Sequence, residues 1–88
     1  MRIRSGYILQ QVMDIYVVMG IGSEAYVPNQ IMSVNETGAF LWRLIEKGTE
    51  KQELVENLVK EYEVDAETAE KDVDAFLTRL REKALIEE

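Results

Sequence analysis

The sequence pattern changes within residues 30–42, which read QIMSVNETGAFLW. Met32 and Val34 share one face of an extended segment, and Ile31 and Ser33 share the other, because strand side chains alternate. Asn35 then offers a side-chain oxygen that can cap a helix, and the apolar residues after it recur at helical spacing. This stretch therefore predicts a strand over 30–34, with Met32 and Val34 facing the core, that leads into a helix over 36–47.

Two earlier segments, 7–12 and 15–19, are rich in β-branched and aromatic residues and are separated by Met13 and Asp14. Such a pair predicts a β-hairpin. Gly20 and Gly22 indicate a turn after it, and we treat 24–29 as a loop, although it could also extend the sheet.

Gly48 is placed to end the helix over 36–47. Two further helices are predicted over 50–62 and 66–83, with Thr49 and Asp65 as their respective N-caps. The apolar stripe of the last helix comprises Ala69, Val73, Phe76, Leu77, Leu80 and Ala84. Three strands followed by three helices favour an α+β fold, in which a three-stranded antiparallel sheet is followed by a winged helix-turn-helix-like unit. We expect residues 1–88 to form a single domain.

Composition excludes several classes of function. The chain has 88 residues with no cysteine and no histidine, so disulfides, thiolate or imidazole metal sites and histidine-dependent catalytic triads are ruled out. The acidic residues over 63–74 have the spacing of helix caps and a solvated face, so we expect no metal, no cofactor and no catalytic site. The sequence carries neither a membrane-spanning run nor a secretory signal, and we expect a soluble, cytoplasmic protein.

The net charge of −7 lies entirely in the second part of the chain, because the charges of residues 1–32 sum to zero. An acidic surface repels phosphates, so it argues against nucleic-acid binding and leaves a basic or mixed peptide as a partner. Trp42 lies about 130° from the centre of its helix stripe and is expected to be partly exposed, either as a contact surface or as a cover for the small core.

An open three-stranded sheet leaves at least one edge with unpaired backbone groups. An extended peptide can pair with such an edge and place alternate side chains in a groove against a neighbouring helix. We therefore consider the strand over 30–34 a candidate peptide site, at which proline in place of Met32 would remove a backbone donor.

Two motifs carry a family resemblance. Residues 35–42, NETGAFLW, follow the strand IMSV, and residues 72–77, DVDAFL, are followed by Leu80. In order and spacing they resemble the coenzyme PQQ synthesis protein D (PqqD) family, and the likeness includes the hairpin. Ala84 stands where the family commonly has glycine.

The resemblance implies a peptide chaperone, or RiPP recognition element, that binds the leader of a ribosomally made precursor peptide and presents it to a modifying enzyme, often a radical SAM enzyme. The leader would pair with the third strand and pack against the third helix. Carried over, the peptide-binding residues are Gln30, Ile31, Met32 and Ser33 on the strand, with Asp74, Leu77, Thr78 and Arg81 on the helix. The flank formed by Asp72, Phe76 and Arg79 remains an equal alternative.

Two other functions compete with this hypothesis. A winged-helix domain could bind DNA or act in transcription, but residues 63–74 of the expected recognition helix hold six acids against Lys71 alone. A structural module could instead use the sheet edge to dimerise, and the sequence leaves open whether the chain is a monomer or a homodimer.

Overall fold

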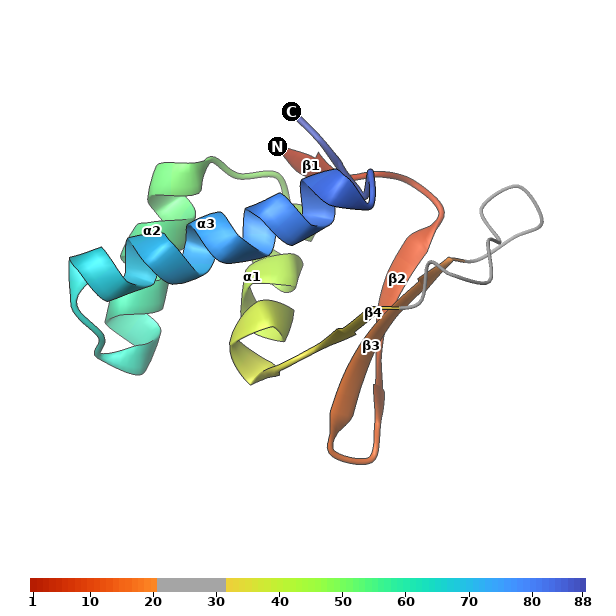
Figure 1. Ribbon diagram of the computed structural model, residues 1–88, viewed down its shortest axis with the longest axis horizontal. Helices are drawn as coiled ribbons and strands as arrows, with labels where there is room; N and C mark the ends of the chain where they lie inside the picture. Colours follow the sequence, from red (N-terminus) through yellow and green to blue (C-terminus); the bar gives the residue numbers. More distant parts are fainter. Residues whose placement is uncertain (21–31) are drawn as a thin grey trace.

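The computed structural model describes residues 1–20 and 32–88. Three helices follow a three-stranded antiparallel sheet, which confirms the predicted α+β fold (Figure 1). The elements in chain order are β1 (Arg2–Ile3), β2 (Tyr7–Val12), β3 (Ile15–Gly20), β4 (Met32–Val34), α1 (Glu36–Glu46), α2 (Lys51–Tyr62), α3 (Ala66–Glu82) and β5 (Ile86–Glu87).

The sheet has the order β2-β3-β4. The β2–β3 hairpin pairs Val12 with Ile15, so the turn consists of Met13, whose φ of 57° is left-handed, and Asp14. The predicted strand over 30–34 is present in its described part as β4, whereas Gln30 and Ile31 lie outside the described residues, as do Gly22 and the loop expected over 24–29.

The helices begin and end close to the predicted positions. Asn35 caps α1, since its Oδ1 accepts a hydrogen bond from the Gly38 amide at 2.8 Å. Asp65 caps α3 in the same way through the Thr68 amide at 2.7 Å. Gly48, with a φ of 86°, makes the turn after α1 in a conformation that disfavours other residues.

The prediction that Thr49 caps α2 is wrong. The cap residue is Glu50, whose side chain makes no capping bond. Thr49 instead pairs with the start of the chain: its amide donates to the Met1 carbonyl at 3.1 Å, and its carbonyl accepts from the Met1 ammonium at 2.7 Å. The backbone of Thr49 is therefore held by a residue 48 positions away in the sequence, and Thr49 does not cap α2.

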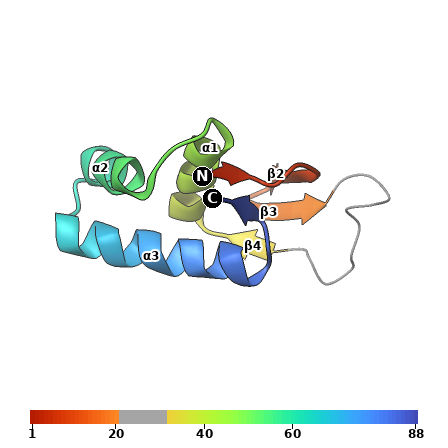
Figure 2. The same cartoon turned by 90° about the horizontal axis from the view of Figure 1, so that it is seen from above.

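The two ends of the chain form a second sheet that the sequence patterns did not predict. Strand β1 pairs with β5 in antiparallel register, with Ile3 opposite Ile86, and the Arg4 amide donates to the Leu85 carbonyl at 2.8 Å. The termini consequently lie side by side in both views (Figures 1 and 2). Strands this short lack the length that makes a periodic pattern detectable.

One hydrophobic core joins β3, β4, β5 and the three helices. Its described buried side chains are Val18, Met32, Val34, Ala39, Leu41, Trp42, Ile45, Leu54, Leu58, Ala69, Val73, Phe76, Leu77, Leu80, Leu85 and Ile86. None of the described helices is both long and apolar enough to cross a membrane.

Two expectations about burial are wrong. Trp42 is fully buried at 0% exposure, because α1 contacts β1, β4 and α2 and therefore buries more than one face. Its indole N–H has no acceptor among the described residues. Ala84 was expected on the apolar stripe of α3, but the helix ends at Glu82 and Ala84 turns outward with a φ of 55°.

Candidate functional site

The candidate site begins at β4, an edge strand of the described three-stranded sheet. Met32 and Val34 are buried beneath the sheet, as predicted, and Ser33 between them is exposed. Strand β4 lies between β3 on one side and α3 on the other (Figure 2). The strand edge that does not pair with β3 therefore faces the helix.

Arg79 of α3 shows which backbone groups this edge presents. Its guanidinium donates to the Ser33 carbonyl at 3.0 Å. In a strand the N–H and C=O of one residue point to the same side, and successive residues alternate. The contact therefore indicates that Ser33 presents both groups outward toward α3, while those of Met32 and Val34 point toward β3.

This geometry corrects the expectation about proline at Met32. The Met32 amide points toward β3, so proline there would disrupt the pairing of β4 within the sheet rather than remove a donor from the open edge. Within the described part of the strand, the outward donor is the Ser33 amide.

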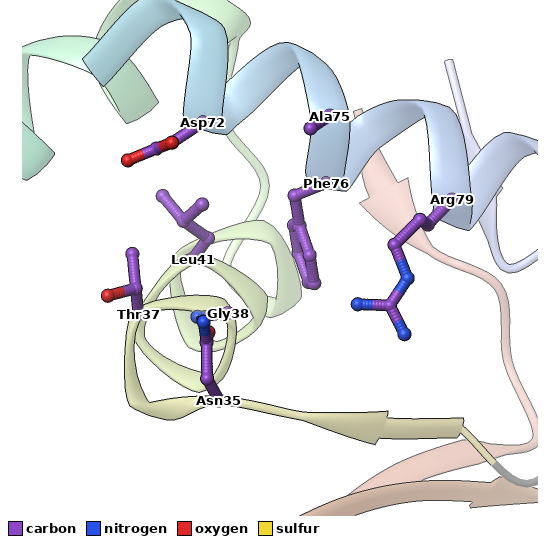
Figure 3. A pocket seen from close by; sticks show the side chains of 8 residues that line it. All are labelled: Asn35, Thr37, Gly38, Leu41, Asp72, Ala75, Phe76 and Arg79. Carbon is purple, nitrogen blue, oxygen red and sulfur yellow. The ribbon is translucent and has the colours of Figure 1, made fainter. Parts of the chain in front are cut away.

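A pocket of about 220 Å³ continues from the strand edge between the start of α1 and the middle of α3. Leu41, Phe76 and Gly38 give it an apolar floor, and Asp72 and Arg79 stand on α3 on either side of Phe76 (Figure 3). The remaining lining residues are Asn35, Thr37 and Ala75. The pocket can thus hold an apolar side chain with an acid at one end and a base at the other.

Local sequence explains why the pocket adjoins the strand. Asn35 ends β4 and caps α1, so the helix starts directly at the end of the edge strand. Gly38 allows α1 to approach α3 closely: a Cβ there would lie 3.2 Å from both the Phe76 ring and the Val34 Cβ. An alanine at this position would require these neighbours to shift by a few tenths of an ångström.

The sequence left two flanks of α3 open, and the structure separates them. Asp72, Phe76 and Arg79 are spaced by four and three residues, so they form one stripe, and this stripe lines the pocket. Asp74 instead contacts α2, where its carboxylate lies 2.7 Å from Lys51 Nζ, and Arg81 contacts the C-terminal residue, with its guanidinium 2.7 Å from a Glu88 carboxylate oxygen.

The other residues predicted for peptide binding are placed as follows. Leu77 is fully buried in the core, as Met32 nearly is, so neither presents a free side chain. Thr78 is exposed on α3, Ser33 lies at the open edge, and Gln30 and Ile31 fall outside the described residues.

The ion pairs of Asp74 and Arg81 also shift proton affinities. The hydrogen bond to Asp74 is the main cause that raises the pKa of Lys51. The hydrogen bond to Glu88 raises the pKa of Arg81, and the same contact lowers the pKa of Glu88. These three groups are in contact with solvent, so their ion pairs contribute little to stability. The shifts show instead which partner each group has within the chain.

Sequence reasoning missed five lining residues: Asn35, Thr37, Gly38, Leu41 and Ala75. It assigned Asn35 to capping, and it gave Thr37, Gly38, Leu41 and Ala75 no role in peptide binding. A glycine inside a helix was the available signal, because it lowers helix stability and usually marks a close approach. Among the described residues, no group of acids is arranged to hold a metal ion.

A small α+β domain with a pocket between α1 and α3, next to the exposed edge of β4, is the class of protein that this geometry defines. The profile of the coenzyme PQQ synthesis protein D (PqqD) family matches residues 16–86, and the chain belongs to that family. Among curated proteins, none matches the sequence at a significant level.

Two solved structures share the fold over almost their whole length. TbiB1 in complex with the TbiA(beta) leader peptide is 28% identical, with a TM-score of 0.77 over 99% of this chain and 95% of its own. Lasso peptide synthetase B1 complexed with the leader peptide is 25% identical, with a TM-score of 0.73 over 96% of this chain and 93% of its own.

Proposed function

We propose that this protein is a non-catalytic adaptor that binds the leader of a ribosomally made precursor peptide as an added strand on β4. The observation that carries the proposal is the outward-facing backbone of Ser33 beside the pocket of α1 and α3. Two proteins that share this fold were solved with leader peptides bound, which supports the same class of partner here.

The proposed groove has the edge of β4 as one wall and the stripe of Asp72, Phe76 and Arg79 as the other. A peptide strand would pair with the outward backbone groups of Ser33, and with those of Ile31 if β4 continues as the sequence predicts. The role of Gln30 stays a prediction. One side chain of the peptide would enter the pocket above Phe76. This stripe replaces Asp74 and Arg81 as our first choice, because those two side chains are already paired within the chain.

Binding would promote chemistry through proximity alone. An adaptor that holds the precursor next to a modifying enzyme raises the effective concentration of the substrate without supplying a reactive group. The partner we propose is a radical SAM enzyme or another peptide-modifying enzyme, and we place the complex in the cytoplasm, where precursor peptides are made. We prefer this function to DNA binding, since the first half of α3 carries five acidic residues in or capping it against Lys71.

The test is the affinity for a synthetic leader of the precursor peptide encoded beside this gene, measured by fluorescence anisotropy. The variant Ser33→Pro removes the outward amide, and the matched control Ser33→Ala keeps it. We expect Ser33→Pro to weaken binding at least about fivefold, as for the loss of one net hydrogen bond of about 1 kcal/mol, and Ser33→Ala to leave it unchanged.

Circular dichroism must show that Ser33→Pro stays folded. We expect it to, because edge strands tolerate proline. Equal affinities of the folded proline variant and the wild type would reject strand addition at this edge. Steeply salt-dependent binding to duplex DNA would favour the DNA-binding alternative instead.

A further inference from the structure

Arg79 is the cation of α3 that lacks a carboxylate partner within the described chain. Lys71 lies 3.6 Å from Glu67, and Arg81 lies 2.7 Å from Glu88. The hydrogen bond of Arg79 goes instead to a backbone carbonyl, that of Ser33. The exposed Arg79 guanidinium therefore contacts a neutral carbonyl, and its charge remains available to a carboxylate of a bound peptide.

The positions four residues before and after Arg79 carry no acid. The position four residues before it is Ala75, and the position four residues after it is the base Lys83. Asp72 lies seven residues away, about 10 Å along the helix axis. Within residues 1–20 and 32–88, no carboxylate is within ion-pair distance of Arg79, although Glu82 lies three positions beyond it.

The Ser33 carbonyl, which accepts the hydrogen bond of Arg79, is also the acceptor that an added peptide strand needs for its own N–H group. A peptide N–H pairing with β4 must donate to an outward carbonyl, and Ser33 provides that carbonyl in the described strand. A peptide N–H on this carbonyl competes with the exposed Arg79 guanidinium for its lone pairs, and a new acceptor on the peptide would favour the release of Arg79. A carboxylate fits best, because it matches the planar fork of arginine with two parallel hydrogen bonds.

We propose that Arg79 exchanges partners on binding: it releases the Ser33 carbonyl to a peptide N–H and pairs with an Asp or Glu side chain of the same peptide. This inference rests on the proposed function and makes Arg79 a specificity-determining residue for the leader. Asp72 at the other end of the pocket repels an acid, so the acid is fixed at the Arg79 end and the register of the peptide is set.

The probe is a phage-displayed library of random 16-residue peptides, selected on the full chain and on Arg79→Ala. Arg81→Ala is the matched control, because it removes an exposed arginine of the same helix that already pairs with Glu88. We expect an acidic residue to be enriched at one position of the peptides selected by the wild type and by Arg81→Ala, and this enrichment to be lost with Arg79→Ala.

One selected peptide is then synthesised with its acid as Glu and as Gln. We expect the change to weaken binding to the wild type about fivefold, the upper end for an exposed ion pair, and to have less than a twofold effect on Arg79→Ala. An equal effect of the change on both proteins would overturn the inference, as would an acid preference that follows Arg81.

Ser33→Pro separates this inference from the function on which it rests. If the acid preference depends on Arg79 but Ser33→Pro binds as well as the wild type, the strand addition is wrong and the acid recognition stands. If the wild type binds the synthetic leader but no library peptide, this inference is rejected and the proposed function stands. The emission of the single tryptophan, Trp42, checks that each variant keeps its core.

Discussion

The end of α3 offers a direct test of the backbone geometry through the variant Ala84→Gly. Ala84 adopts a φ of 55° immediately after the cap residue Lys83. Its amide donates to the Arg81 carbonyl at 3.0 Å, and the Leu85 amide donates to the Leu80 carbonyl at 2.9 Å. These two bonds form a Schellman motif, in which glycine is the preferred left-handed residue.

The magnitude follows from two opposing terms. A left-handed conformation costs an L-residue about 1–2 kcal/mol, which glycine avoids. Glycine in turn gives the unfolded chain more conformational entropy, which cancels about 0.4–1 kcal/mol of that gain in stability. The Ala84 methyl is exposed, so its removal leaves no cavity. We therefore expect Ala84→Gly to raise the free energy of unfolding by about 0.5–1 kcal/mol, or the melting temperature by about 2–8 °C.

Urea unfolding followed by the emission of Trp42 measures this difference. Ala75→Gly is the matched control, since Ala75 is exposed in the interior of the same helix and the same substitution there should destabilise by about 1 kcal/mol. Opposite signs at the two positions are the expected result. If Ala84→Gly also lowered the unfolding free energy, the reasoning from left-handed strain would be refuted.

Three further outcomes are expected. Replacing the cap Asn35 with alanine should lower the unfolding free energy by about 1 kcal/mol in the same urea assay, because the Gly38 amide loses its acceptor, and an unchanged midpoint would contradict the capping role. The hydrogen bonds to Thr68 lower the pKa of Asp65 below 3.8, so its contribution is present above that pH and is lost as the pH falls through the lowered pKa. The wild type should therefore lose stability relative to Asp65→Asn in acid titrations followed by circular dichroism, and parallel curves would argue against it. The emission of Trp42 should be blue-shifted and protected from acrylamide in the native state, and an exposed-type spectrum would contradict its burial.

The sequence by itself determined the order and most of the boundaries of β2, β3, β4 and the three helices. The hairpin, the strand at Met32 and Val34 and the caps Asn35 and Asp65 all depend on interactions within a few residues, which a local pattern encodes. The family resemblance also depends on short continuous segments, because its two motifs are a strand-to-helix junction and part of one helix. These features require no knowledge of how the elements pack.

Tertiary structure decided which side chains the site can use. A helical wheel gives the direction of Trp42 relative to its own helix but not that α1 is covered on several sides, so the tryptophan is buried. Likewise, both flanks of α3 have similar sequences. Only the packing of α2 against one flank pairs Asp74 with Lys51 and leaves Asp72 at the pocket beside α1 and Arg79 at the strand edge, because burial and ion pairing depend on neighbours distant in sequence.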